Sequence, residues 1–175
     1  MHHFPYYFKG RVVTGFGRGG KQLGCPTANL DDTAVSQLPS DFPCGVFYGL
    51  AQVDEGKLYG MVMSVGNNPH FKNERKTIEV HILHHFDEDF YGADLRAVAI
   101  GYLRSMTAFN SLGLFFLAMI FIIFFNIMSF ESFSDELKVA IKNDIAIAEM
   151  NLQQCNMEHY EQMDHFRRGN TVRIL

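Results

Sequence analysis

Two neighbouring motifs near the N-terminus combine residue types suited to binding Mg²⁺ and phosphate. The first is a glycine-rich loop, GFGRGGK at 15–21, which ends in the cation Lys21. Glycine lets backbone N–H groups approach an anion because no Cβ stands in the way. In the second, PTAN at 26–29, the proline favours an extended backbone, so Thr27 and Asn29 point to the same face. A hydroxyl and an amide oxygen beside a phosphate-binding loop suit Mg²⁺, a hard ion that keeps water and phosphate as its other ligands.

The same glycines match the short dinucleotide-binding and P-loop patterns, but the residues that follow argue against both. Either pattern requires a helix to begin directly after the glycines. Here GCP at 24–26 contains helix breakers, and Gln22 stands where a P-loop has its Ser or Thr ligand. For this stretch by itself, a glycine-rich hairpin without a ligand stays an open alternative.

Glu79 is the candidate for a general base. It belongs to KTIEVHILHH at 76–85, where strand alternation places Glu79 and His81 on one face. The opposite face carries the apolar residues expected in a core, Ile78, Val80 and Ile82. A carboxylate on a strand is most often a solvated surface group. Next to apolar residues and facing a pocket, however, partial burial would raise its pKa toward the working pH and let it accept a proton.

The histidines of this segment raise a zinc site as an alternative. His84 and His85 are consecutive and point to opposite faces of a strand, and His81 is paired with neither at a usual ligand spacing. The spacing therefore argues against zinc in this segment.

The length and composition of the chain indicate about one globular domain. It has 175 residues, of which 47% are hydrophobic and 19% charged, enough to build a sizeable core. The net charge of −4 gives no reason to expect nucleic acid as a partner. Three cysteines, an odd number without a CxxC pair, predict reduced thiols in a cytoplasmic setting. The first residues, MHHFPYYFKG, lack the apolar region of a secretory signal.

The elements that must position these side chains are predicted to be short strands. Apolar or alternating runs predict strands at 6–14, 27–30, 45–53, 60–65, 77–84 and 94–103. The segments between them include three predicted turns, DEG at 54–56, GNNP at 66–69 and DED at 87–89. Six short strands with no helix among them predict a small antiparallel β-barrel.

Taken together, the motifs resemble the riboflavin kinase (flavokinase) family, in the family's order and over most of the chain. The resemblance rests on GFGRG at 15–19, LGCPTAN at 23–29, GVFYG at 45–49, SVGNNP at 64–69, IEVHI at 78–82, DFYG at 89–92 and GYLR at 101–104. It implies a mainly β fold, a six-stranded antiparallel Greek-key barrel with a C-terminal α-helix. With no room for a second, FAD-forming domain, the chain is similar to the stand-alone eukaryotic type.

The activity implied by this resemblance is transfer of the γ-phosphate of ATP to the 5′-hydroxyl of riboflavin, giving FMN and ADP. ATP is then a co-substrate, and the expected metal is Mg²⁺, with Zn²⁺ or Mn²⁺ as alternatives. We expect a cytoplasmic monomer without a nucleic-acid partner.

The resemblance also implies roles for individual residues. Glu79 would be the catalytic base, and Thr27 and Asn29 would hold the metal. The ATP site would contain Gly15, Lys21, Thr27, Ile82, His84 and Tyr91. Arg104, Thr107 and Phe109 would lie on a loop that closes over the flavin.

An apolar segment interrupts the family pattern. Residues 112–130 are apolar except for Gly113, Asn126 and Ser129, close to the ~20 residues that cross a bilayer. In the family the chain runs almost directly from the equivalent of 112 to that of 131, so 113–130 resembles an insertion. It could be a transmembrane helix, a buried or interfacial helix, or a uridine-rich intron read in frame, and we favour the intron. A membrane partner is expected only through 112–130.

The predicted domain organisation follows from this. Residues 1–112 form the barrel with its flavin loop, 113–130 the insertion, 131–153 the C-terminal helix and 154–175 a frayed tail. Ser134 is the predicted N-cap, and the helix has one apolar face, formed by Leu137, Ile141, Ile145, Ala148 and Leu152. Two other function classes stay open. They are a non-catalytic flavin- or nucleotide-binding barrel, and a membrane-anchored interaction protein that uses 112–130.

Overall fold

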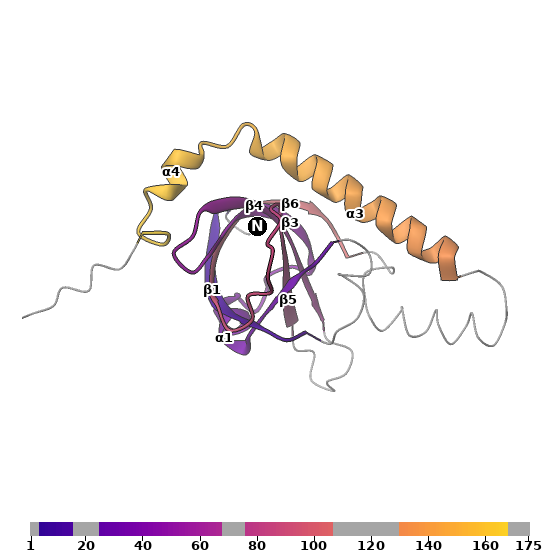
Figure 1. Ribbon diagram of the computed structural model, residues 1–175, viewed down its shortest axis with the longest axis horizontal. Coiled ribbons are helices and arrows are strands. Elements are labelled where there is room, and N and C mark those ends of the chain that lie inside the picture. Colours follow the sequence, from indigo (N-terminus) through magenta and orange to yellow (C-terminus); the bar gives the residue numbers. More distant parts are fainter. Residues whose placement is uncertain (1–3, 16–24, 68–75, 107–129, 168–175) are drawn as a thin grey trace, which may run out of the picture.

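A closed six-stranded barrel forms the centre of the molecule (Figure 1). The computed structural model describes residues 4–15, 25–67, 76–106 and 130–167. Its strands are β1 (Tyr6–Val13), β2 (Ala28–Leu30), β3 (Gly45–Val53), β4 (Leu58–Asn67), β5 (Lys76–Ile82) and β6 (Asp94–Arg104). The strands are ordered β1-β2-β5-β4-β3-β6 around the barrel, and every neighbouring pair is antiparallel. Because β3, β4 and β5 are consecutive neighbours and β6 returns beside β3, the connection is a Greek key. The predicted fold is confirmed.

The strand bounds differ from the prediction mainly in β4. This strand was predicted over 60–65, but it pairs along its whole length with β3 and β5 and runs from Leu58 to Asn67. Gly66 and Asn67 therefore belong to a strand and not to the predicted turn, because Thr77 and Lys76 of β5 pair with them. The predicted turn at 54–56 is present between β3 and β4.

A short helix between β2 and β3 contradicts the prediction that no helix interrupts the strands. Helix α1 (Asp32–Gln37) begins after Asp31, whose side chain accepts a hydrogen bond from the Ala34 N–H. Six residues are too few to show a helical repeat, so the cap is the signal that matters here. Gly10 lets α1 lie against β1, since a Cβ at that position would come within 2.5 Å of the Ala34 Cβ.

The barrel interior is filled by large side chains that alternate along the strands. On β5, Ile78, Val80 and Ile82 are buried, while the residues between them face outward and are half-buried. This alternation is the predicted one. Inward-facing side chains of every strand meet in one cluster, which includes Phe8, Leu30, Phe47, Met61, Met63, Ile78, Val80 and Leu95. The outer face of β5 is thereby left for polar residues.

Helix α3 (Phe130–Leu152) lies across the outside of the barrel, against β3, β4 and β6 (Figure 1). Its predicted apolar face is the one that packs, with Ile145 and the fully buried Ala148 next to Val46 and Val62. The predicted N-cap is wrong. Ser134 lies inside the helix, whose backbone is already helical at Phe130, so its cap preference does not decide where the helix begins.

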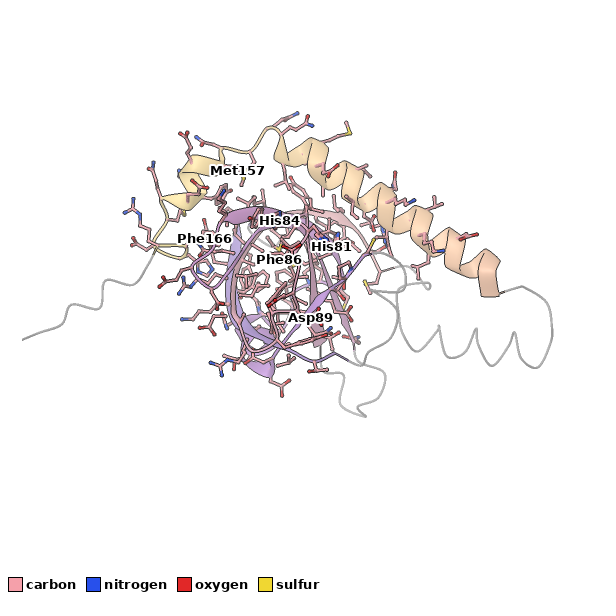
Figure 2. The ribbon with its side chains drawn as sticks, in the orientation of Figure 1. His81, His84, Phe86, Asp89, Met157 and Phe166 are labelled. Carbon is pink, nitrogen blue, oxygen red and sulfur yellow. The ribbon has the colours of Figure 1, made fainter. Side chains whose placement is uncertain are left out.

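The residues after α3 pack against the barrel up to residue 167, contrary to the predicted fraying from 154. They form helix α4 (Met157–Glu161), capped by the Asn156 side chain. Phe166 is 5% exposed in a cluster with Leu50 and Val98, and Figure 2 shows it on the barrel side of this segment. Cys155, Met157 and Tyr160 of the same segment pack against this cluster as well, so the segment has an apolar side of its own.

The described residues on either side of 107–129 form one packed unit. Met106, at the end of β6, contacts the cluster that contains Val46, Val62 and Ala148. The chain just after β6 and helix α3 therefore pack together, and both would lie on the same side of a membrane. Most of the predicted insertion, 113–129, lies outside the described residues, while Phe130 begins α3. Among the helices described, none is long and apolar enough to cross a membrane.

Candidate active site

Glu79 lies between two polar neighbours on the outer face of the barrel. It is in register with Asn29 of β2 on one side and with Ser64 of β4 on the other. Side chains directly opposite each other on neighbouring strands have Cβ atoms about 4.5–5.5 Å apart. The Thr27 hydroxyl donates a long hydrogen bond of 3.4 Å to Glu79 Oε2. A carboxylate, two hydroxyls and an amide thus converge at one place, although Thr27 and Glu79 are 52 residues apart.

Burial tunes the acidity of Glu79. The loss of water around the carboxyl raises its pKa above the ordinary value, and the hydrogen bond from Thr27 opposes part of that shift. Desolvation disfavours the ionised form, whereas a donor to the carboxylate favours it. The result is a carboxylate that accepts a proton more readily than an exposed glutamate, as a general base requires.

Glycine at position 15 brings the end of β1 against Asn29. A Cβ on Gly15 would come within 2.2 Å of Asn29 Nδ2, so no other residue fits without displacing the amide. On the other side, His81 Nδ1 donates to the Pro26 carbonyl oxygen over 2.8 Å and ties the segment before β2 to β5. The first residue of the glycine-rich loop and the PTAN run therefore meet, as the sequence predicts. Lys21 lies outside the described residues.

The donors gathered here fit a hard cation. Thr27 and Asn29 offer neutral oxygens, and Glu79 adds a carboxylate close by. Within the described ranges, no three His, Cys, Asp or Glu side chains come together as a metal site. Mg²⁺ binds oxygen ligands and completes its coordination with water and phosphate, so Thr27 and Asn29 could hold it.

The residues assigned to the nucleotide occupy different environments. Ile82 is 5% exposed and belongs to the barrel core. The ring of His84 is stacked on Tyr59, with centroids 4.0 Å apart, and Phe86 meets it edge-on. Tyr91 is 55% exposed. In the described ranges, no side-chain hydrogen bond or ring contact joins these residues to Glu79, so their role in ATP binding stays a prediction.

Arg104 has a partner that the sequence reasoning missed. At the end of β6, its Nε and Nη2 donate to the two carboxylate oxygens of Asp144 on α3, over 2.8 and 2.6 Å. The Asp144 side chain is 7% exposed and that of Arg104 25%. The sequence marks Asp144 as unusual, because this carboxylate interrupts the apolar stripe three residues after Ile141, but it does not identify Arg104 as the partner. Thr107 and Phe109, the other residues predicted at the flavin, lie outside the described residues.

A half-buried carboxylate beside hydroxyl and amide oxygens on a small closed barrel is an arrangement that can take a proton from a hydroxyl group and hold a cation next to it, as a phosphotransferase requires. The model of the flavokinase (riboflavin kinase) family matches residues 2–117. The chain belongs to the riboflavin kinase family, and it is a transferase that phosphorylates riboflavin with ATP to give FMN.

Individual relatives agree with this assignment. The chain is 51% identical to a human riboflavin kinase over 112 residues, which are 64% of this chain and 72% of that protein. It is 49% identical to a mouse riboflavin kinase, with the same coverage. The crystal structure of a riboflavin kinase from Trypanosoma brucei has a TM-score of 0.61 at 24% identity and covers 96% of this chain and 92% of that one. At that identity the likeness shows the fold.

Proposed function

We propose that the cluster around Glu79 is where phosphoryl transfer to riboflavin takes place, with Glu79 as the general base. The observation that carries this proposal is the convergence of Thr27, Asn29 and Ser64 on a carboxylate whose pKa is raised by burial. Glu79 accepts the proton of the ribityl 5′-hydroxyl as the oxygen attacks the γ-phosphorus of ATP. One O–P bond forms, the bond to ADP breaks, and the proton stays on the carboxylate until product release.

Thr27 and Asn29 are the proposed metal ligands. A divalent cation held there, for which we propose Mg²⁺, supplies charge neutralisation on the phosphate oxygens. The Thr27 hydroxyl has a second role in this proposal, because its bond to Glu79 keeps the carboxylate oriented and partly offsets the effect of burial. The fit of Gly15 against Asn29 supports placing the nucleotide phosphates at the end of β1, where the glycine-rich loop begins.

Arg104 is the one predicted flavin residue in the described part of the chain, and we propose it as a flavin contact with Asp144 as its positioning residue. A planar guanidinium suits a flat isoalloxazine. Two charge-assisted hydrogen bonds to a buried carboxylate fix the plane of that guanidinium, and they come from helix α3. Helix α3 would thus contribute to substrate binding as well as to barrel packing.

The test is a direct assay with the full chain. Riboflavin, ATP and MgCl₂ are incubated with the protein, and FMN is separated from riboflavin by chromatography. Time-dependent FMN formation that requires both ATP and a divalent cation is the expected result. Binding of riboflavin without FMN formation would instead favour a non-catalytic flavin-binding barrel. Activity that requires detergent or vesicles would favour a membrane-anchored protein.

A cytoplasmic, monomeric enzyme is the form we propose. The three cysteines, Cys25, Cys44 and Cys155, are free thiols, which suits a reducing compartment. Size-exclusion chromatography with light scattering tests the oligomeric state.

A further inference from the structure

A second concave surface lies on the side of the barrel away from Glu79. Strand β6 is diametrically opposite β5 in the strand order. Between β1, β6 and the segment that follows α4 there is a surface cavity of about 330 Å³, closed on one side by Gln37 of α1. The side chains that matter in its lining are Tyr7, Lys9, Arg96, Asp164, His165 and Arg167. Three cations thus face one carboxylate.

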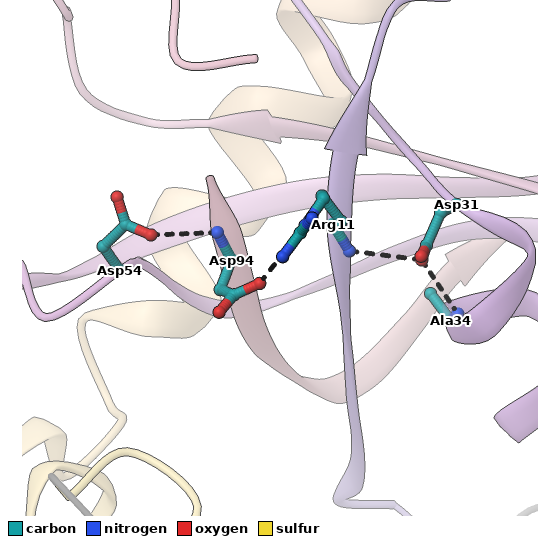
Figure 3. A network of polar contacts seen from close by, with 5 residues as sticks. All are labelled: Arg11, Asp31, Ala34, Asp54 and Asp94. Carbon is teal, nitrogen blue, oxygen red and sulfur yellow. Dashed lines mark hydrogen bonds and ion pairs between the residues drawn. The ribbon is translucent and has the colours of Figure 1, made fainter. Parts of the chain in front are cut away.

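The charge arrangement in this cavity is unusual for two paired strands. Lys9 of β1 and Arg96 of β6 stand directly opposite each other. Like charges in that relation destabilise a sheet. The next pair on the same face of these strands is Arg11 and Asp94, two residues further along. These two have opposite charges and form an ion pair at 3.8 Å (Figure 3).

In the described part of the chain, no ion pair at close range relieves the repulsion between Lys9 and Arg96. Among the described residues, neither Lys9 nor Arg96 forms an ion pair within 4.0 Å, Asp164 included. Lys9 is exposed and Arg96 half-buried, so the two side chains hold their charges at the rim of the cavity, within reach of a ligand from solvent.

The pKa of His165 responds to the positive charges that line the cavity. Its Nε2 donates to the Phe8 carbonyl oxygen over 3.1 Å, and its ring packs edge-on against Tyr7. Burial lowers the pKa of this imidazole, and the charges of Arg96 and Lys9 lower it further, while the bond to Phe8 offsets part of the shift. An anion bound between the cations would cancel their effect on the ring.

We propose that this cavity is a binding site for a phosphorylated small molecule, with Arg96, Lys9 and Arg167 around the phosphate and Tyr7 beside the organic part. The planar fork of arginine matches the oxygens of a phosphate group. A cavity of about 330 Å³ has room for more than one oxyanion and lies at the small end of the volumes of ligand pockets. The site is separate from the Glu79 cluster and needs no part of the proposed chemistry.

The experiment follows the imidazole C–H resonance of His165 by NMR, identified by its loss in His165→Gln. The full chain is titrated with inorganic phosphate, ribose 5-phosphate and AMP at constant ionic strength. The expected result is saturable binding, at least tenfold tighter for one organic phosphate than for inorganic phosphate, with the imidazole titrating at higher pH when the ligand is bound. The charged groups that face the ring are Lys9, Arg96, Asp164 and Arg167.

Lys9→Gln and Arg96→Gln should each weaken binding at least tenfold. They should melt at or above the wild-type temperature because each removes a like-charge contact. Arg11→Gln is the matched control and should bind as the wild type does. An unchanged His165 resonance, no preference for the organic phosphates, or equal losses in the control would overturn the proposal. The readout is independent of FMN formation, so a failure of the kinase assay would leave it interpretable.

Discussion

Replacing Asp144 by asparagine tests how helix α3 supports the flavin site. The change keeps the size of the side chain but removes its charge and one of the two hydrogen bonds to Arg104, which measure 2.8 and 2.6 Å. A hydrogen bond to a charged group contributes roughly 1.5–3 kcal/mol, and the partial exposure of Arg104 argues for the lower half, about 2 kcal/mol. For a chain of this length, that corresponds to a fall in Tm of about 4–8 °C.

The catalytic readout separates a positioning role from a purely structural one. If Asp144 orients Arg104 toward the flavin, KM for riboflavin should rise by about tenfold, which corresponds to ~1.4 kcal/mol, while KM for ATP stays unchanged. In an Arg104→Met background, Asp144→Asn should have little further effect on KM for riboflavin, because the two residues act together.

Asp135→Asn on the same helix is the matched control. Asp135 is 71% exposed and pairs with Lys138 at 3.1 Å, and such surface pairs contribute about 0.2–1 kcal/mol at most. The control should therefore change Tm by about 4 °C at most, and by less than Asp144→Asn does. Equal Tm changes in the two variants, or a parallel rise in KM for riboflavin and ATP in Asp144→Asn, would refute the reasoning.

Three further predictions concern the metal, the base and the insertion. Thr27→Val keeps the shape of the side chain but removes its oxygen, so the Mg²⁺ concentration for half-maximal FMN formation should rise; an unchanged Mg²⁺ titration would show that Thr27 is no ligand. Because burial raises the pKa of Glu79, the fall of kcat/KM toward acid pH should begin at a higher pH than it would for an exposed glutamate. Thr27→Val should move this acid limb of the pH profile to a still higher pH, since the variant removes the hydrogen bond that favours the carboxylate. An acid limb at the ordinary glutamate pKa in both proteins would contradict the account. Deleting 113–129, so that Leu112 precedes Phe130, should increase soluble yield and preserve FMN formation, because the described residues on both sides of 107–129 pack together; loss of folding in the shortened chain would show that the segment is integral to the domain.

Features that depend on local alternation were accessible from the sequence. The β5 pattern places Glu79 outside and Ile78 and Val80 inside whatever the rest of the fold does, and the structure has them so. The spacing of Thr27 and Asn29 likewise fixes their common direction. The Greek-key topology of the barrel came from the family resemblance and not from these local patterns.

Features that depend on contacts distant in sequence were not accessible. Nothing near Arg104 in the chain indicates Asp144, which lies 40 residues away on another element. The packing of residues 154–167 depends on Phe166, Met157 and Tyr160 meeting a cluster on the barrel that contains Leu50 and Val98, which are about 60–120 residues away in the sequence. Helix α1 was missed because one cap at Asp31 defines it rather than a repeat of apolar residues.

The most direct measurement for the central claim is the rate of FMN formation by Glu79→Gln at saturating riboflavin and ATP. A general base contributes about 10²–10⁴-fold, so kcat should fall by that factor while both substrates still bind. The fold should survive. A carboxyl whose pKa is raised in the folded state contributes stability below its ordinary pKa and loses it as pH rises through the raised value. At pH 7 the glutamine variant should therefore melt no lower than the wild type. A variant with intact Tm and near-wild-type kcat would contradict the assignment of Glu79 as the base.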